Sequence, residues 1–340
     1  MDRHSALDPL HPLGDGTRVL VQPNDGVLPL LELIGNAKRS VWIKQFTFTH
    51  PALLDAVIAA HNAGHDVRVM MNPHRSSGDR ANDAAFSMLE AAGVKAQWSS
   101  PSFAVTHEKS MLIDDRLAMI ATFNFTEKYF TLTRDYGLLT ERPAEVAEIR
   151  TCFEADWNRQ VFHPAQGTAL LWSNRNSRRN MSAFIDTARH SLDIQHPKFV
   201  DATILDRIAQ ASRRGVNVRV LCGGKHGISE WDVLDTFASL RVMEQFGVKV
   251  RKQKDLRVHA KLLIVDGHSA LVGSMNIDRS AFDVRRELGA VVAGKAAVHL
   301  LASTFEADWH AAHHYDAPDP LLSHTHVEDD FPHDPDLVHE

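Results

Sequence analysis

The sequence repeats itself with a period of about 150 residues, and this repeat limits the folds open to the chain. The pentapeptide FEADW occurs at Phe153–Trp157 and again at Phe305–Trp309, an offset of 152 residues. Further upstream, DVRVM at Asp66–Met70 corresponds to NVRVL at Asn217–Leu221, an offset of 151 residues. Solenoid repeats have periods of roughly 20–50 residues, so the chain is not of that kind. Two similar domains are predicted instead.

Both halves alternate strand-like and helix-like segments in the same order. Strands are expected at 18–22, 41–45, 67–71, 192–195 and 216–221, and helices at 51–63, 80–92 and 202–214. Hairpins are expected at 106–121 and 258–273, and helices that end in FEADW follow at 145–157 and 296–310. Strands that alternate with helices over short connections predict an α/β fold with mixed, largely parallel sheets covered on both faces.

The chain is accordingly divided into four parts. We predict an N-terminal tail at 1–17, a first unit at 18–162, a second unit at 163–315 and a C-terminal tail at 316–340. The segment His163–Gly167 reads as the linker. The C-terminal tail is acidic and rich in His. A metal-binding tail is one interpretation, because His and Asp are metal ligands, but its composition favours a disordered, solvated segment.

Charge says little about partners. Lys and Arg number 37 against 43 Asp and Glu, a net charge of −6, but eight of the acids follow residue 310, where there is no Lys or Arg. The folded body is therefore nearly neutral, which neither excludes nor requires a polyanionic partner.

Targeting signals and disulfides are not expected. No apolar run approaches the roughly 20 residues of a membrane helix. The first residues have no basic region followed by an apolar stretch, so no signal peptide is predicted. Two cysteines, Cys152 and Cys222, cannot form a disulfide framework. We expect a cytoplasmic protein, with peripheral contact at a membrane as a compatible location.

One motif, His-x-Lys-x4-Asp, occurs at the same place in both halves. The first copy is His107, Lys109 and Asp114, and the second is His259, Lys261 and Asp266. On a strand, residues i and i+2 point to the same face, so each His should project beside its Lys. The Asp falls at the far end of the hairpin. Holding the turn or accepting backbone N–H groups is its favoured role, with direct chemistry as the alternative.

The strand after each motif brings hydroxyl and amide groups back to the same end. These candidate phosphate-binding residues are Thr122, Asn124, Ser274 and Asn276. Lysine, amide and hydroxyl donors suit the non-bridging oxygens of a phosphate. Two such sets facing each other would enclose one phosphodiester between two histidines, one to attack phosphorus and one to protonate the leaving oxygen. Because two lysines supply positive charge, no metal and no cofactor is expected.

A histidine nucleophile needs one ring nitrogen free and the other held by a hydrogen bond. An acidic residue lies 28 positions after each motif histidine, Asp135 in the first half and Glu287 in the second. We predict that these acids orient the histidines. Surface ion pairs with Arg134, Arg285 or Arg286 are the alternative.

These residues resemble the phospholipase D superfamily, the phosphodiesterases with two His-Lys-Asp motifs. The resemblance covers about residues 18 to 315 and rests on HEKSMLID, HAKLLIVD, GSMN and the acidic residue that follows. It implies two duplicated α-β-α sandwich units packed about a pseudo-two-fold, one active site between them and a phosphohistidine intermediate. It also implies that His107 and His259 are nucleophile and general acid, with His107 favoured as nucleophile. The first half departs from the family at Ala121-Thr122, where Gly-Ser is common, and at Asp135, where Glu is more usual.

The reaction class is better defined than the substrate. The second motif is similar to those of cardiolipin-synthase relatives, which favours phospholipids and either a phospholipase D or a phosphatidyl transferase. A nuclease acting on DNA or RNA is the alternative, and an inactive scaffold is a weaker one because both motifs are complete. A monomer is sufficient for one active site.

Further segments bear on the choice of substrate. The segment Trp98–Phe103 could dock on a bilayer or be a buried connector. A nuclease would need a basic channel, for which the candidates are Lys128, Arg134, Lys252, Lys254, Arg257, Arg279, Arg285 and Arg286. His196 corresponds by approximate register to Phe46 of the first half and is expected as a cleft or core residue. Lys225, His226 and Arg75 follow strands and are candidate substrate contacts or parts of solvated loops.

Overall fold

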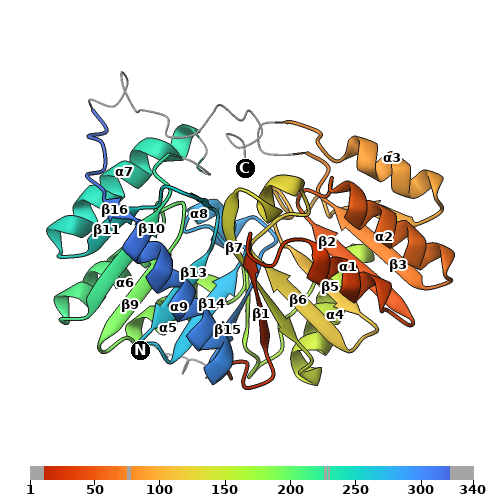
Figure 1. Ribbon diagram of the computed structural model, residues 1–340, viewed down its shortest axis with the longest axis horizontal. Coiled ribbons are helices and arrows are strands. Elements are labelled where there is room, and N and C mark those ends of the chain that lie inside the picture. The colour runs from red at the N-terminus through yellow and green to blue at the C-terminus, as the bar shows by residue number, and fades with distance from the viewer. Residues whose placement is uncertain (1–10, 75–77, 226–227, 229, 322–340) are drawn as a thin grey trace, which may run out of the picture.

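The computed structural model describes residues 11–74, 78–225, 228 and 230–321, and its two halves lie side by side (Figure 1). The first sheet has the strand order β1-β7-β6-β5-β2-β3-β4, and the short β12 pairs with β7. Its strands are Arg18–Gln22 (β1), Ser40–Gln45 (β2), Asp66–Met71 (β3), Lys95–Trp98 (β4), Ser110–Ile113 (β5), Leu117–Ala121 (β6), Thr133–Thr140 (β7) and Arg257–Val258 (β12).

The second sheet repeats this arrangement with the order β16-β11-β10-β9-β13-β14-β15-β8. Its strands are Leu170–Trp172 (β8), Ser191–Gln195 (β9), Asn217–Cys222 (β10), Lys249–Lys252 (β11), Leu262–Val265 (β13), Ser269–Gly273 (β14), Leu288–Val292 (β15) and His313–His314 (β16). Both sheets are mixed, which confirms the predicted duplicated α/β fold. The parallel part is smaller than predicted: it comprises β2-β3-β4, β9-β10-β11 and the short β12 beside β7, because the strands of the two hairpins pair antiparallel.

Helices cover both faces of each sheet. They are Leu28–Gly35 (α1), Pro51–Asn62 (α2), Asp83–Ala91 (α3), Pro143–Trp157 (α4), Ser177–Asp186 (α5), Ala202–Arg213 (α6), Glu230–Gln245 (α7), Arg279–Asp283 (α8) and Lys295–Ala311 (α9), with a 3-10 turn at Glu127–Phe130. One apolar core lies under α1–α3 and a second under α5–α7. The central core joins Phe153 of α4 and Phe305 of α9 to strands of both sheets. The two FEADW helices therefore pack between the sheets.

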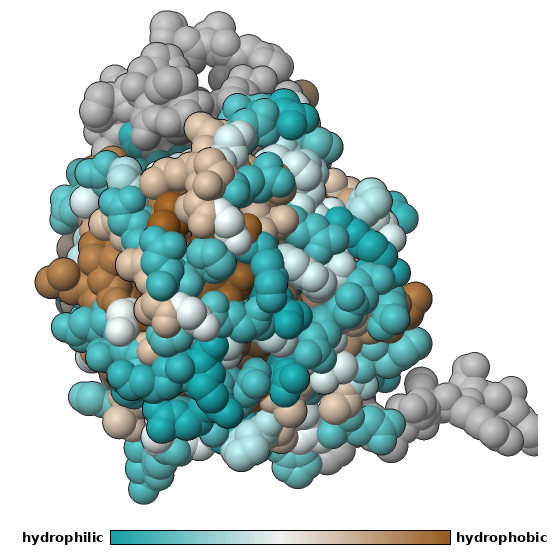
Figure 2. Space-filling view, turned by 90° about the vertical axis from the view of Figure 1, so that its right-hand side faces the viewer, coloured by the Kyte–Doolittle hydropathy of each residue, from teal (hydrophilic) through white to brown (hydrophobic). Residues whose placement is uncertain are grey.

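Local sequence explains where these helices begin. Proline occupies the first turn of α1, α2 and α4, where its missing N–H costs nothing. Asp201 and Asp278 cap α6 and α8 by accepting the backbone N–H of Ile204 and Ala281. On the side of α1–α3, the outer surface is mostly hydrophilic with smaller hydrophobic groups between (Figure 2). In the described ranges, no helix is long and apolar enough to span a membrane.

Parts of both predicted tails pack against the second half. Leu13 is fully buried and forms a parallel bridge with Val292 of β15. Near the other end, Ala317 is buried, and its carbonyl accepts a hydrogen bond from Arg241. The rest of the tails, residues 1–10 and 322–340, lies outside the described residues.

Candidate active site

Each His-x-Lys segment pairs with the other half of the molecule. The backbone N–H groups of His107 and Glu108 both donate to the carbonyl of Arg286, at 2.9 Å each. The N–H groups of His259 and Ala260 donate likewise to Arg134, at 3.2 and 2.9 Å. The prediction that the motif histidines lie on their hairpin strands is therefore wrong, because β5 begins only at Ser110 and β13 at Leu262.

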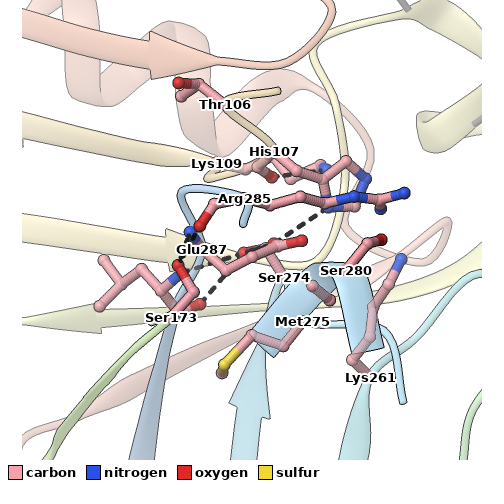
Figure 3. A network of polar contacts seen from close by, with 12 residues as sticks. Thr106, His107, Lys109, Ser173, Lys261, Ser274, Met275, Ser280, Arg285 and Glu287 are labelled. Carbon is pink, nitrogen blue, oxygen red and sulfur yellow. Dashed lines mark hydrogen bonds and ion pairs between the residues drawn. The ribbon is translucent and has the colours of Figure 1, made fainter. Parts of the chain in front are cut away.

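This pairing exchanges the acidic partners between the halves. Nδ1 of His107 lies 3.0 Å from Oε2 of Glu287, and Nδ1 of His259 lies 2.6 Å from Oδ1 of Asp135 (Figure 3 shows the first pair). Both acids thus contact the motif histidines, but each contacts the histidine of the other half, so the expectation that an acid lies beside the histidine of its own half is wrong. The carbonyl of Arg286 binds the His107 segment, and Glu287 is the next residue. The carbonyl of Arg134 binds the His259 segment, and Asp135 is the next residue. Each acid is therefore placed beside the histidine of the other half.

The predicted phosphate-binding hydroxyls donate hydrogen bonds to the acids. Oγ1 of Thr122 donates to Oδ1 of Asp135 at 2.5 Å, and Oγ of Ser274 donates to Oε2 of Glu287 at 2.6 Å. A hydroxyl has a single hydrogen to donate, and here it is directed to the carboxylate, so the phosphate-binding role of Thr122 and Ser274 stays a prediction. Ser173, which the sequence did not single out, accepts the backbone N–H of Glu287 at 2.8 Å.

The two motif lysines are buried beside the histidines. Nζ of Lys109 donates to the carbonyl of His107 and Nζ of Lys261 to that of His259, at 2.8 Å each. Nζ of Lys261 also lies 2.9 Å from Nε2 of His259. Both lysines are at most 2 % exposed. Burying an ammonium group away from water is costly unless an anion accompanies it.

Burial and neighbouring cations keep the histidines neutral. The pKa of His107 is lowered well below its ordinary value by burial, and further by Lys109 and Arg285. Burial and the nearby Lys109 also lower the pKa of Lys261 well below its ordinary value. Burial raises the pKa of Glu287 to about 7 against the pull of Lys109. For Asp135, burial is the largest effect, but His259, Lys261 and Thr122 together outweigh it, so its pKa is lowered. The site thus favours an incoming anion.

Three buried polar atoms of the candidate site residues lack hydrogen-bond partners in the described part of the chain. They are Nε2 of His107, Oδ1 of Asn276 and Oε1 of Glu287. By contrast, Oδ1 of Asn124 accepts the backbone N–H of Thr47 at 3.3 Å. A buried polar atom without a partner costs about 1–3 kcal/mol, so a site that retains such atoms is suited to a ligand that satisfies them.

The motif aspartates lie at the far ends of the hairpins. Asp114 accepts the backbone N–H groups of Arg39 and Ser40, and Asp266 those of His190 and Ser191, at 2.7–3.0 Å. Both aspartates have positive φ angles in their turns, 57° and 52°. These contacts hold each hairpin against the start of β2 or β9. They fit the turn-holding role, and the strand separates both carboxylates from the histidines.

The first half accommodates its departure from Gly-Ser. Ala121 lies opposite Gly137 in the sheet, whereas Gly273 of the second half lies opposite Gly289. A Cβ atom on Gly273 would come within 2.6 Å of Cα of Gly289, so only glycine fits there.

A buried ionic network that the sequence analysis missed surrounds the site. Arg286 donates to Asp156 at 2.8 Å, and Arg134 donates to Asp308 at 2.7 and 3.0 Å. Both aspartates belong to the repeated FEADW, so each FEADW helix binds the arginine of the other half. The repeat itself was the signal that could have indicated this role.

The first half adds Lys44 to this network. Its Nζ lies 2.7 Å from Asp156, 3.0 Å from Glu108 and 3.7 Å from Sγ of Cys152. Burial opposes the ammonium form, but these neighbours outweigh it and raise the pKa of Lys44. Glu108, Cys152 and Asp156 have the spacing of metal ligands, but the ammonium group sits among them instead.

Other sequence candidates take structural positions or lie outside the described residues. His196 is buried, with Nδ1 accepting the N–H of Lys198, and it corresponds to Gln45 rather than Phe46, because Phe199 and Phe48 make equivalent bridges. His226 and Arg75 lie outside the described residues. Trp98 stacks on Phe86, with ring centroids 3.9 Å apart, so the segment that it begins packs as a connector and is no exposed apolar loop.

The fold and the paired His-x-Lys segments define a member of the phospholipase D superfamily. The chain belongs to the family described as cardiolipin synthase, phospholipase D-like domain, which matches residues 30–157 and 181–309. Similar curated proteins include a cardiolipin synthase of Oceanobacillus iheyensis, 26 % identical over 82 % of this chain and 65 % of the relative. The major cardiolipin synthase of Bacillus subtilis is 25 % identical over 85 % of this chain and 68 % of the relative. The chain thus spans about two thirds of their length.

Solved structures support the fold. A phosphatidylserine synthase of Haemophilus influenzae superposes with a TM-score of 0.71 over 92 % of this chain and 90 % of its own, at 15 % identity. A polyphosphate kinase of Porphyromonas gingivalis superposes with a TM-score of 0.69 over 88 % of this chain and 48 % of its own, at 16 % identity. At such identities, the likeness concerns the fold alone.

Proposed function

We propose that the protein is a phosphatidyl transferase that acts on phospholipids through a phosphohistidine intermediate. The observation that carries this proposal is the His107–Glu287 pair, in which the acid holds Nδ1 and leaves the buried Nε2 without a partner among the described residues. Nε2 is then available to attack phosphorus. The cardiolipin synthases among the relatives support a phospholipid as substrate.

In the first step, Nε2 of His107 attacks phosphorus and the bond from phosphorus to the leaving alkoxide breaks. His259 transfers its proton to that oxygen, so a neutral alcohol departs. Lys109 and Lys261 stabilise the negative charge of the five-coordinate phosphorus. The asymmetry between the halves supports His107 as the nucleophile: Nε2 of His107 is unpartnered in the described part of the chain, whereas Nε2 of His259 lies 2.9 Å from Nζ of Lys261.

In the second step, an alcohol replaces the histidine. His259, now neutral, accepts the proton of the incoming hydroxyl, whose oxygen attacks phosphorus as the bond to His107 breaks. Water in place of the alcohol would give hydrolysis. Asp135 and Glu287 hold the two rings through both steps, as the carboxylate does in a Ser-His-Asp triad.

A nuclease would need an open basic channel, and the described residues favour it less. Of the eight basic candidates, only Lys254 and Arg279 are exposed. Arg134 and Arg286 are buried in ion pairs with Asp308 and Asp156. These arginines hold the two halves together and are not displayed to a nucleic acid.

Product analysis by mass spectrometry tests the proposal. The purified protein is incubated in EDTA with mixed phospholipid vesicles, single-stranded DNA and ethanol. We expect phosphatidylethanol or cardiolipin from the wild type and none from His107→Ala or His259→Ala. Arg116→Gln, an exposed change on the β5–β6 turn, is the matched control. Shortened DNA with intact lipid would overturn the proposal in favour of a nuclease.

A further inference from the structure

A pocket of about 450 Å³ lies at the start of α5, outside the site described above. Its wall includes three arginines within five residues, Arg175, Arg178 and Arg179, and one acid, Asp283. A smaller pocket of about 230 Å³ adjoins it and shares Arg175 and Arg179. We call the larger one the α5 pocket.

Two of the three arginines have no acidic partner among the residues that the structure describes. Arg178 is held by Asp283 at 2.6 and 2.9 Å and by Asp201 at 3.0 Å. Arg175 and Arg179 are exposed, and neither makes an ion pair with any residue that the structure describes. The α5 pocket therefore carries an excess of positive charge.

Arg178 and Arg179 lie in the first turn of α5, where a positive charge destabilises the helix. The N-terminus of an α-helix has a partial positive charge, so acids stabilise the first turn and arginines destabilise it. The corresponding helix of the first half, α1, begins instead with Leu28 and Pro29. A first turn that breaks this local rule is better explained by a ligand than by stability.

Hydroxyl groups add a second, independent indication. Ser177 lines the α5 pocket and is only 2 % exposed, yet its hydroxyl has no hydrogen-bond partner in the described ranges. The hydroxyl of Ser182, also in the wall, is buried without a partner there as well. Guanidinium groups, hydroxyls and the first N–H groups of a helix are together the donors that bind phosphate oxygens.

The α5 pocket opens beside the active site, at the same edge of the second sheet. Ser173, directly before the pocket residue Asn174, accepts the N–H of Glu287 and donates to the carbonyl of Arg285 (Figure 3). Phe282 and Asp283 of α8 also line the pocket, and they lie only a few residues before Glu287 in the chain. A surface bound at the α5 pocket would thus face the edge that bears the two histidines.

We propose that the α5 pocket binds the phosphate group of an anionic phospholipid and turns the active-site edge toward the bilayer. This inference rests on the proposed function, since it takes the substrate to be a membrane lipid. The pocket is a docking site: Arg175 and Arg179 contact the bilayer, and they take no part in the transfer of the phosphatidyl group. A basic residue near an anionic membrane surface strengthens binding by about 1 kcal/mol, or roughly fivefold.

Vesicle sedimentation tests the inference without turnover. The His107→Ala protein is mixed with vesicles of phosphatidylglycerol and phosphatidylcholine, with and without Arg175→Gln and Arg179→Gln. We expect the double change to weaken binding by on the order of tenfold or more. Arg18→Gln with Arg116→Gln removes the same charge at the opposite edge, and this control should bind as the parent does. Equal binding by both double variants would overturn the inference.

Titration calorimetry with inorganic phosphate distinguishes the two sources of a phosphate group. Saturable binding of inorganic phosphate that the Arg175 and Arg179 changes abolish, with unchanged vesicle binding, would overturn the lipid assignment. The failure of the proposed function looks different. In that case wild-type protein forms no phosphatidylethanol, while the loss of vesicle binding in the pocket variant still stands.

Discussion

His107 of the first half and Glu287 of the second half lie 3.0 Å apart, so neither half contains a complete histidine–acid pair. The same holds for His259 and Asp135 at 2.6 Å. Each exchange follows from a backbone contact, since the carbonyl of the residue before the acid binds the His-x-Lys segment of the other half. The duplicated halves are therefore interdependent in chemistry as well as in packing.

Removing the charge of Glu287 should greatly slow the first step, the attack of His107 on phosphorus. Glu287→Gln keeps the size of the side chain but can present its amide instead of an acceptor to Nδ1 of His107. We expect kcat to fall on the order of hundredfold or more, as loss of the orienting carboxylate does in a catalytic triad. In rapid-quench experiments this variant should form little phosphoenzyme. Glu154→Gln, an exposed change on α4, is the control. Normal phosphoenzyme formation by Glu287→Gln would contradict the role of the pair.

The pH dependence of activity should report on Glu287. Its pKa of about 7 is raised from the ordinary 4.5, chiefly by burial. The ionised form is the better acceptor for His107, so kcat/KM should rise with pH through about 7. The pKa of Asp135 is lowered, so its ionisation adds no further pH dependence of kcat/KM in that range. A profile that is flat between pH 5 and 8 would show that ionisation of Glu287 does not limit the reaction.

The same shift makes a prediction for stability. The folded protein holds the proton of Glu287 more tightly than the unfolded chain, so this group favours folding fully below about pH 4.5. Its contribution is lost as the pH rises through about 7. Glu287→Gln has no such dependence. The free energy of unfolding of the variant, relative to wild type, should therefore rise between pH 4.5 and 7, which urea titrations at several pH values measure.

Binding of an anion should raise the pKa of His259. Burial lowers this pKa in the free protein, and Lys261 and Lys109 lower it further. An oxyanion between the lysines would offset their charge, so the ring could hold the proton that a general acid needs. NMR titration of ring-labelled protein with vanadate should show His259 gaining a proton, and vanadate should inhibit turnover. Inhibition without protonation would place the acid elsewhere.

The sequence predicted the architecture and the two paired His-x-Lys segments, but it could not predict the contacts between the halves. A repeat of about 150 residues and the alternation of strand-like and helix-like segments predict two similar α/β units, because those signals can be read along the chain. The exchange of Asp135 and Glu287 depends on how the units dock. The spacing of residues along the chain carries no information on how the two units dock. Nor could the sequence show whether the hydroxyl groups of Thr122 and Ser274 donate to a phosphate or to a carboxylate, because both groups accept hydrogen bonds.

The repeated FEADW tests how the halves depend on one another. Asp156 binds two buried cations, Lys44 at 2.7 Å and Arg286 at 2.8 Å, whereas Asp308 binds one, Arg134. Leaving a buried charge unpaired costs about 3–5 kcal/mol. Asp156→Asn should therefore lower the free energy of unfolding by about this amount and by more than Asp308→Asn does.

Both changes should also reduce kcat, because Arg286 and Arg134 supply the carbonyls that hold the His-x-Lys segments. Denaturant titrations measure the stability of both variants, and Asp186→Asn on the exposed end of α5 controls for the loss of a surface carboxylate. The kinetic effect should persist at low temperature, where both variants remain folded. If the folded variants turned over like wild type, the arginine–aspartate pairs would stabilise the fold without positioning the histidines.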